Sequence, residues 1–181
     1  MVKNKGFTYY ELLIAITIMT LMVGFTTIGV STAYRNSVTR SAEKIESACK
    51  EARNSALAKG NQVGYANFYR KDGKLYCHVG DEINASTNPV NLNSQNWEVV
   101  AYNFDHVYVT FNTGAGIVSM PANSGTLFTI GFKQSTGEVT GLKYPYASET
   151  TKYKSDIEIT VHKGNNSSSV NIGRFGVIEV D

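Results

Sequence analysis

Charged residues and prolines are missing from a long stretch near the N-terminus. Residues 12–30, LLIAITIMTLMVGFTTIGV, contain no Asp, Glu, Lys, Arg, His or Pro, and the first proline in the chain is Pro89. A helix over these residues would be about 28 Å long at ~1.5 Å per residue, close to the ~30 Å hydrocarbon core of a bilayer. The sequence therefore predicts a membrane-spanning helix. Because nothing interrupts it, we expect one continuous helix from about residue 8 to about residue 59.

Cysteine and histidine are scarce, and neither forms a pattern typical of a metal or catalytic site. Cys49 and Cys77 are too few for a disulfide framework and lack the CxxC spacing of zinc and redox sites. They could form one disulfide if the chain is exported, although burial as free thiols is the favoured interpretation. His78, His106 and His162 share no motif, and the sequence shows no HExxH motif, Ser/His/Asp order or phosphate loop. We therefore expect no metal, no cofactor and no enzymatic activity.

The chain divides into four zones, which together predict an α+β fold. Residues 1–6 are a basic leader, residues 7–30 the apolar segment, residues 31–60 an amphipathic continuation of the helix, and residues 61–181 a β-rich head. On the continuation, one face is apolar at helical spacing: Tyr34, Val38, Ala42, Ile45, Cys49, Ala52 and Ala56. The opposite face is polar: Asn36, Arg40, Glu43, Ser47, Lys50 and Asn54.

In the head, the apolar pattern changes to a period of two and turn residues become frequent. Asp72-Gly73 stands between two alternating runs, which predicts a hairpin. Further strand-like runs follow in residues 97–112, 126–144 and 155–180, whereas residues 80–96 have no periodicity and predict a long exposed loop. Regular short strands of this kind are typical of antiparallel sheets. We expect the helix to pack on a C-terminal antiparallel domain, with two sheets.

Glu11 is the one carboxylate beside the apolar segment, and it separates three interpretations of the N-terminus. A cleaved secretory signal could end at Ala33, but its apolar region would exceed the usual 7–15 residues. An uncleaved membrane anchor with its positive end inside the cell is the second interpretation. Neither of these two interpretations assigns a role to Glu11 at the start of the apolar run.

The third interpretation comes from a resemblance. Gly6, Phe7, Thr8 and Glu11, followed by LLIAI, resemble the class III signal of type IV pilins and pseudopilins. The resemblance implies cleavage between Gly6 and Phe7 by prepilin peptidase, N-methylation of Phe7, residence in the cytoplasmic membrane and later transfer to a filament at the cell surface or in the envelope. It also implies that Glu11 neutralises the new amino group of a neighbouring subunit. Tyr9 and Tyr10, and the lack of a helix-bending proline, depart from the family pattern.

A ridge of small residues on the apolar segment fits helix packing. Thr17, Thr20, Gly24, Thr27 and Ser31 follow spacings of three and four residues. Small residues of this kind let helices approach closely. Chance placement of weakly polar residues in a membrane anchor is the alternative.

Further short motifs resemble the GspH/FimT family of minor pseudopilins and minor pilins. The matching positions are Ala52, Arg53, Ala56, Leu57 and Val63 around the helix end, Phe132 and Gly137 in a later hairpin, and Gly173 and Gly176 near the C-terminus. The resemblance implies a long helix packed on two antiparallel sheets. The alternative is that Arg53 is a solvated helix-end charge and the glycines are ordinary turn residues.

The leading expectation is a structural subunit that helps initiate or cap assembly of a type IV pilus or a type II secretion-like pseudopilus. Its partners would be other pilin subunits. A major pilin and a filament-borne receptor for DNA or a surface are the alternatives. DNA binding is not favoured, because the chain without its leader has 15 basic and 15 acidic residues (17 − 2 = 15 against 15). The local basic cluster, Arg70, Lys71 and Lys74, is more typical of a solvated turn.

Overall fold

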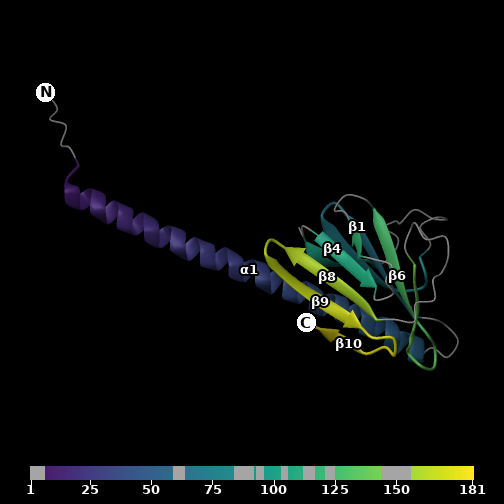
Figure 1. Ribbon diagram of the computed structural model, residues 1–181. Coiled ribbons are helices and arrows are strands. Elements are labelled where there is room, and N and C mark those ends of the chain that lie inside the picture. Colours follow the sequence, from purple (N-terminus) through teal and green to yellow (C-terminus); the bar gives the residue numbers. More distant parts are fainter. Residues whose placement is uncertain are drawn as a thin grey trace.

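One long helix, α1 (Tyr9–Ala58), dominates the structure, and its 50 residues run without a break. The computed structural model describes residues 7–58, 64–83, 92, 96–102, 106–111, 117–120, 125–143 and 156–181. Figure 1 shows the first half of α1 projecting away from the head and the second half packed against it. The bounds confirm the predicted helix to within one residue at each end, as expected for an apolar run followed by an amphipathic one with no proline.

The second half of α1 buries the predicted apolar face. Val38, Ala42, Ile45, Cys49, Ala52 and Ala56 are buried, whereas Tyr34 keeps 40% of its surface and marks the point where the head begins to cover the helix. The polar residues expected on the opposite face are all exposed. Glu46 and Lys50 form an i,i+4 ion pair, with 2.6 Å between Nζ and Oε1.

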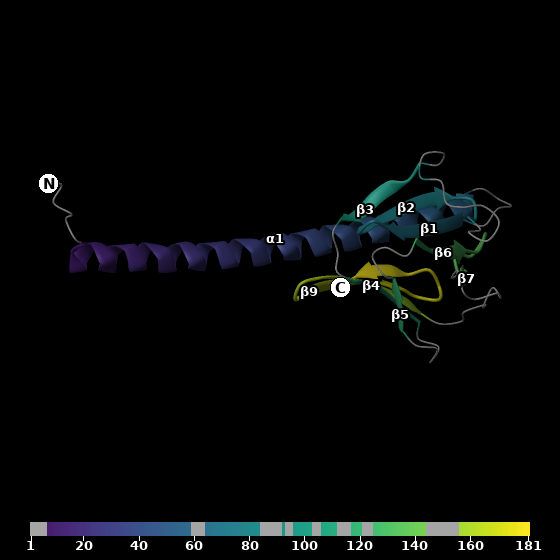
Figure 2. The same cartoon turned by 90° about the horizontal axis from the view of Figure 1, so that it is seen from above.

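The head consists of two five-stranded antiparallel sheets, as predicted. The first sheet has the order β3-β2-β1-β6-β7 and comprises β1 (Gly64–Lys71), β2 (Lys74–Gly80), β3 (Glu98–Tyr102), β6 (Thr126–Phe132) and β7 (Val139–Lys143). The second has the order β10-β9-β8-β4-β5 and comprises β4 (His106–Phe111), β5 (Ile117–Met120), β8 (Ile157–Lys163), β9 (Asn166–Ile172) and β10 (Ile178–Val180). α1 contacts strands of both sheets. Figure 2 shows that the two sheets lie on different sides of the helix.

The hairpin predicted at Asp72-Gly73 joins β1 to β2. Both turn residues have positive φ, 51° and 70°, as a two-residue type I′ turn requires. The turn sets the register in which Phe68 pairs with Cys77 and Lys71 with Lys74. The strand β5 was not predicted, and most of the exposed loop expected at residues 80–96 lies outside the described residues.

A single hydrophobic core is shared by α1 and both sheets. Phe68 of β1 stacks on Phe128 of β6 with 4.7 Å between ring centroids. The helix supplies small side chains where the first sheet approaches it, and a Cβ added at Gly64 would lie 2.0 Å from the carbonyl oxygen of Ala52. The glycine that opens β1 therefore permits this close contact between sheet and helix.

A buried polar network fixes the end of β2. Asn67 of β1 is fully buried. Its Nδ2 donates to the carbonyl oxygens of His78 (3.3 Å) and Asp81 (3.0 Å). Its Oδ1 accepts hydrogen bonds from the backbone N–H of Ile83 (3.2 Å) and from Oγ1 of Thr129 (2.8 Å). All donor and acceptor capacity of the amide is used, so the network is structural.

Candidate functional site

The start of α1 has its own hydrogen-bonding arrangement around Glu11. Oε2 of Glu11 accepts hydrogen bonds from the backbone N–H of Thr8 (2.8 Å) and from its Oγ1 (2.9 Å). The N–H of Glu11 donates in return to Oγ1 of Thr8 (3.4 Å), and the N–H of Leu12 donates to the Thr8 carbonyl (3.2 Å). This is a capping box, with Thr8 as the N-cap and Glu11 three residues on. The T-x-x-E pattern is visible in the sequence, but our sequence analysis missed it.

The residues expected at the processing site precede this cap. Gly6 lies outside the described residues. Phe7 lies before the first helical residue and is 86% exposed. The Gly6–Phe7 bond therefore falls just ahead of the helix.

The expected packing ridge lies on a helix surface that the head leaves uncovered. Oγ1 of Thr17 donates to the carbonyl of Leu13 (2.8 Å), and Oγ1 of Thr20 to the carbonyl of Thr17 (2.8 Å). A Cβ at Gly24 would meet nothing within 4 Å, and the side chain of Thr27 lies outside the described ones. Because the two hydroxyls bond to their own helix, the ridge offers small, internally satisfied groups to a neighbour.

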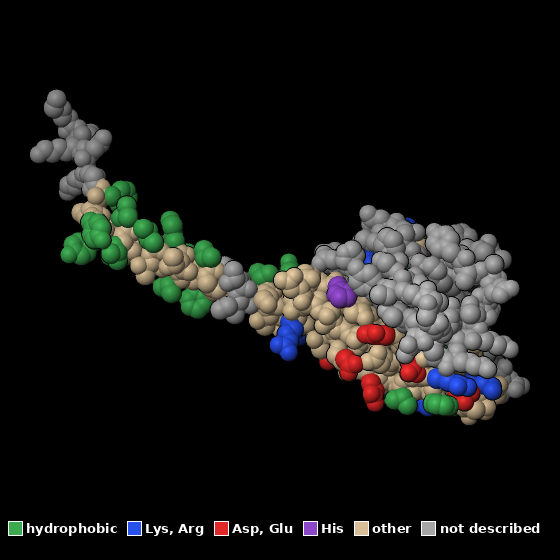
Figure 3. Space-filling view, viewed as in Figure 1, with side chains coloured by type: hydrophobic (Ala, Val, Ile, Leu, Met, Phe, Trp, Pro, Cys, Tyr) green, Lys and Arg blue, Asp and Glu red, His purple; other side chains and the backbone are tan. Residues whose placement is uncertain are grey.

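In the apolar half of α1, every side chain that the structure describes is exposed. An 18-residue window of α1, near the N-terminus, is long and apolar enough to cross a membrane, and no part of it is buried against the rest of the chain. Figure 3 shows hydrophobic side chains along this half, and the first Lys or Arg visible in this view lies where the helix nears the head. Lipid or other helices would cover this surface, because a bare apolar helix in water is unfavourable.

At the other end of α1, the short motifs of the GspH/FimT resemblance meet. A Cβ at Gly137, which follows β6, would lie 2.7 Å from Nε of Arg53, and a Cβ at Gly176, between β9 and β10, would lie 2.5 Å from it. Both glycines have positive φ, 66° and 81°. Nε of Arg53 is buried and has no hydrogen-bond partner among the described residues. Arg53 is half-buried with its Nε between turns of both sheets, whereas the alternative interpretation expected a fully solvated helix-end charge.

A backbone hydrogen bond joins the two sheets beside Arg53. The N–H of Val139, the first residue of β7, donates to the carbonyl of Arg174 in the turn before β10 (3.1 Å). Gly173 and Gly176 shape that turn through the hydrogen bond from Gly176 N–H to Gly173 O (2.8 Å). Of the other residues of the resemblance, Phe132 is buried, Leu57 is exposed and Val63 lies outside the described residues.

Of the three basic residues expected at the surface of the β1–β2 turn, one, Arg70, is buried. Arg70 is only 1% exposed, and its guanidinium donates to the carbonyl oxygen of Met120 in the second sheet. Lys71 is exposed, and Lys74 lies over the ring of Tyr102 with its Nζ 5.6 Å from the centroid. The interpretation of Arg70 as part of a solvated turn is therefore wrong. It shares the core face of β1 with Ala66 and Phe68, which a strict two-residue alternation would have indicated.

The two cysteines are buried free thiols on α1 and β2. Desolvation raises the pKa of each thiol well above its usual value; the charge of Glu46 adds to this for Cys49, as do Cys49, Glu98 and Glu51 for Cys77. Thiols in such surroundings stay protonated and are poor nucleophiles and ligands. Among the described residues, no group of three or more His, Cys, Asp or Glu is placed to hold a metal ion.

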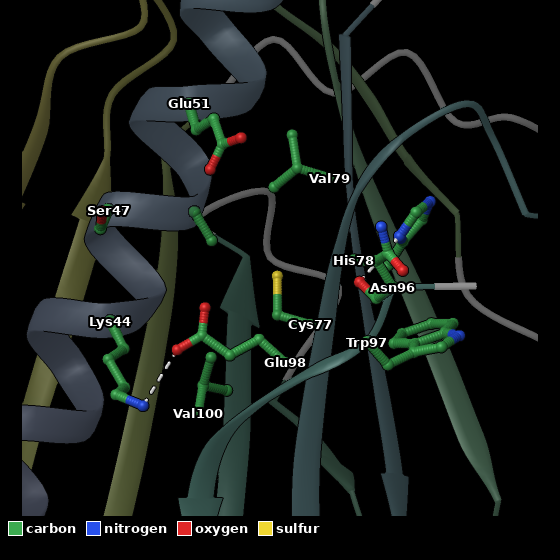
Figure 4. A pocket seen from close by; sticks show the side chains of 11 residues that line it. Lys44, Ser47, Glu51, Cys77, His78, Val79, Asn96, Trp97, Glu98 and Val100 are labelled. Carbon is green, nitrogen blue, oxygen red and sulfur yellow. Dashed lines mark hydrogen bonds and ion pairs between the residues drawn. The ribbon is translucent and has the colours of Figure 1, made fainter. Parts of the chain in front are cut away.

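A hollow of about 650 Å³ lies between α1 and the edge of the first sheet, close to Cys77. Nζ of Lys44 donates to Oε1 of Glu98 (3.0 Å) and to the carbonyl of Val99 (3.2 Å). Figure 4 shows this ion pair on the helix side of the hollow and Trp97 at its far side. Its lining mixes cationic, anionic and apolar groups: Lys44, Ser47, Ala48, Glu51, Cys77, His78, Val79, Asn96, Trp97, Glu98 and Val100. The ion pair joins α1 to the edge strand β3. We therefore interpret the hollow as part of the contact between helix and sheet and not as a ligand site.

Comparisons of the chain with protein-family models, with curated proteins and with solved structures gave no match.

Proposed function

We propose that the chain is a minor subunit of a type IV pilus or a type II secretion-like pseudopilus. One observation carries the proposal: α1 is a continuous helix whose apolar first half is bare while its second half is built into the head. Such a helix needs lipid around its first half before assembly, and neighbouring helices around it afterwards. The helix can exchange one environment for the other without refolding the head, because the two halves have separate partners.

The N-terminal signal supports the same proposal. The bond between Gly6 and Phe7 precedes the first helical residue in the sequence, so cleavage by a prepilin peptidase there would not cut α1. Cleavage would create a cation at Phe7, four residues before Glu11 in the chain. In a filament, Glu11 of one subunit would neutralise that cation of an adjoining subunit. Breaking such a buried pair by removing one partner typically costs about 3–5 kcal/mol, enough to fix the position of a subunit.

The surroundings of Arg53 support a subunit of the GspH/FimT kind. Arg53, Gly137 and Gly176 are far apart in sequence and lie within contact of one another. Under the alternative interpretation, the turns that contain Gly137 and Gly176 would be independent surface turns. In the structure, both turns pack against Arg53. This is the feature that favours a minor subunit near the filament tip over an abundant major pilin. The abundance of the chain in sheared filaments separates the two.

The test of the proposal is the intact mass of the full chain extracted from membranes. We expect the loss of residues 1–6 and the gain of one methyl group on Phe7. Gly6→Val should block both changes, because the family's peptidase accepts only a very small residue there. A mature chain beginning at Tyr34 would contradict the proposal and restore the secretory signal.

A further inference from the structure

The end of the head that faces the apolar half of α1 has a defined composition. Tyr34 and Arg35 lie on α1, and the tip of the β8–β9 hairpin packs against Tyr34. Nζ of Lys163 lies 5.2 Å from the centroid of the Tyr34 ring, and a Cβ at Gly164 would lie 3.5 Å from Cδ2 of Tyr34. Figure 1 shows this hairpin tip directed toward the N-terminal end of the helix. We call Tyr34, Arg35, Arg40 and Lys163 the basal surface.

The basal surface is positively charged. No Asp or Glu occurs in residues 31–42 or 163–170, and Glu43 is the first carboxylate beyond Arg40. Arg35 and Arg40 are exposed, and Lys163 is half-buried. The ion pairs of α1 among the described residues involve Lys44 and Lys50, further along the helix. Figure 3 shows basic side chains where α1 reaches the head, ahead of the acidic ones.

Tyr34 and Arg35, with Lys163 beside Tyr34, lie at the depth of lipid headgroups, and Arg40 lies beyond it. The apolar run ends at Val30 and the first charge after it is Arg35. At ~1.5 Å per residue, Tyr34 and Arg35 stand about 6–8 Å above the end of the apolar run, and Arg40 about 15 Å above it. The headgroup region is ~5–8 Å thick on each side of the core. Helical side chains tilt toward the N-terminus, which directs both arginines back toward the bilayer. Tyr is enriched at such interfaces.

We propose that the basal surface binds anionic phospholipid headgroups and so holds the head on the membrane before assembly. This rests on the membrane insertion of α1 in the proposed function but not on filament formation. Arg35 and Lys163 would contact phosphate oxygens directly, while Arg40 acts within the ~8 Å screening length of physiological salt. Transfer to a filament then requires these contacts to break. A higher content of anionic lipid should therefore slow extraction of the subunit from the membrane.

The test uses the full chain in vesicles with a spin label on Asn165→Cys. Asn165 is exposed at the hairpin tip, whereas the native Cys49 and Cys77 are buried, so the chain without this substitution serves as the labelling control. A lipid with a Ni²⁺-chelating headgroup broadens the label signal when the label is close. We expect at least twofold greater broadening in vesicles containing phosphatidylglycerol than in pure phosphatidylcholine, and loss of the difference at ~0.5 M salt.

A matched pair of variants assigns the effect to the basal surface. Arg35→Gln with Arg40→Gln should at least halve the dependence on lipid charge, because Lys163 remains as the one cation of the basal surface. Lys133→Gln should not, because this exposed cation follows β6 near Gly137, at the Arg53 end of α1. Circular dichroism checks that each variant is folded.

Equal broadening in the two vesicle types, or an equal loss with Lys133→Gln, would overturn this proposal alone. A chain that alkaline carbonate extracts from the vesicles would overturn membrane insertion as well.

Discussion

Glu11 has two chemical roles at the residue scale, and substitutions separate them. It closes the capping box with Thr8 within its own chain, and it is proposed to neutralise Phe7 of a neighbour in a filament. The cap needs only a hydrogen-bond acceptor, which Gln also supplies. The ion pair needs the charge.

We predict that Glu11→Gln and Glu11→Ala both reduce incorporation into filaments, while Thr8→Ala does not. Thr8→Ala removes the cap, at a cost of about 0.5–2 kcal/mol, but leaves the carboxylate. The measurement is the ratio of the subunit in sheared filaments to that in membranes, with intact mass confirming processing. If Glu11→Gln were incorporated normally and Thr8→Ala were not, the capping box, and not the charge of Glu11, would be the feature that incorporation requires.

Gly176 is the residue on which the contact between the two sheets and Arg53 most depends. Its φ is 81°, and a Cβ would lie 2.2 Å from the carbonyl oxygen of Gly137. We predict that Gly176→Ala lowers the free energy of unfolding by ~2–5 kcal/mol, through a strained backbone and overpacking. Gly164→Ala is the control, because its φ of 58° is also positive but its nearest contact would be 3.5 Å.

Thermal unfolding by circular dichroism compares the two variants. The control should lose only ~1–2 kcal/mol, the backbone cost alone. For a chain of this size, 1 kcal/mol corresponds to roughly 2–4 °C in Tm. Equal shifts for the two variants would show that Arg53 and Gly137 are not tightly packed against Gly176.

At the scale of elements, α1 joins two halves whose stability has different sources. Among the α1 side chains that the structure describes, Val38 is the first that the head buries completely, so the described part of the first half contributes none to the core. Isolated helices of this kind are marginal in water. The second half is held by its packing on both sheets.

We therefore predict that a chain beginning at Ser31 is soluble and folds cooperatively, with a Tm close to that of the full head in detergent. A chain beginning at Ala42 is the control. It lacks Val38, which is 1% exposed, and should lose about 1.5–3 kcal/mol. Aggregation of the longer fragment, with exposed apolar surface detected by dye binding, would contradict the separation of the two halves.

At the scale of the whole molecule, charge sets what the head can bind. Residues 61–181 carry 9 Lys and Arg against 11 Asp and Glu, a net charge of 9 − 11 = −2, and the fragment beginning at Ser31 carries 15 against 14, a net charge of 15 − 14 = +1. The burial of Arg70 removes one cation from the β1–β2 turn. Nucleic-acid binders display a basic patch that contacts several phosphates.

We predict that the fragment beginning at Ser31 binds DNA no tighter than the non-specific range of about 10⁻⁴–10⁻⁶ M at physiological salt. A fluorescence anisotropy titration measures this. Submicromolar binding that Lys71→Glu with Lys74→Glu abolishes would make a DNA receptor the leading function. Arg70 is unsuitable for that test, because changing it would disturb the core.

The sequence by itself determined the features that depend on neighbours along the chain. The length of α1 follows from an uncharged, proline-free run, and its buried face from helical spacing between Val38 and Ala56. The β1–β2 hairpin follows from Asp72-Gly73, whose backbone suits a type I′ turn. Each of these signals is contained within a few turns or one hairpin, so periodicity and turn chemistry were enough to predict them.

Only the tertiary structure determined whether polar residues with partners far away in the sequence are buried or exposed. Arg70 beside a turn gave a local pattern typical of solvent exposure, yet Met120 of the other sheet accepts its hydrogen bond. Arg53 lies between Gly137 and Gly176 because both sheets close over the helix end, and Asn67 is buried because Asp81, Ile83 and Thr129 satisfy its amide. Burial of a polar group is favourable only when its partners are present, and these partners come from strands whose positions no local pattern specifies.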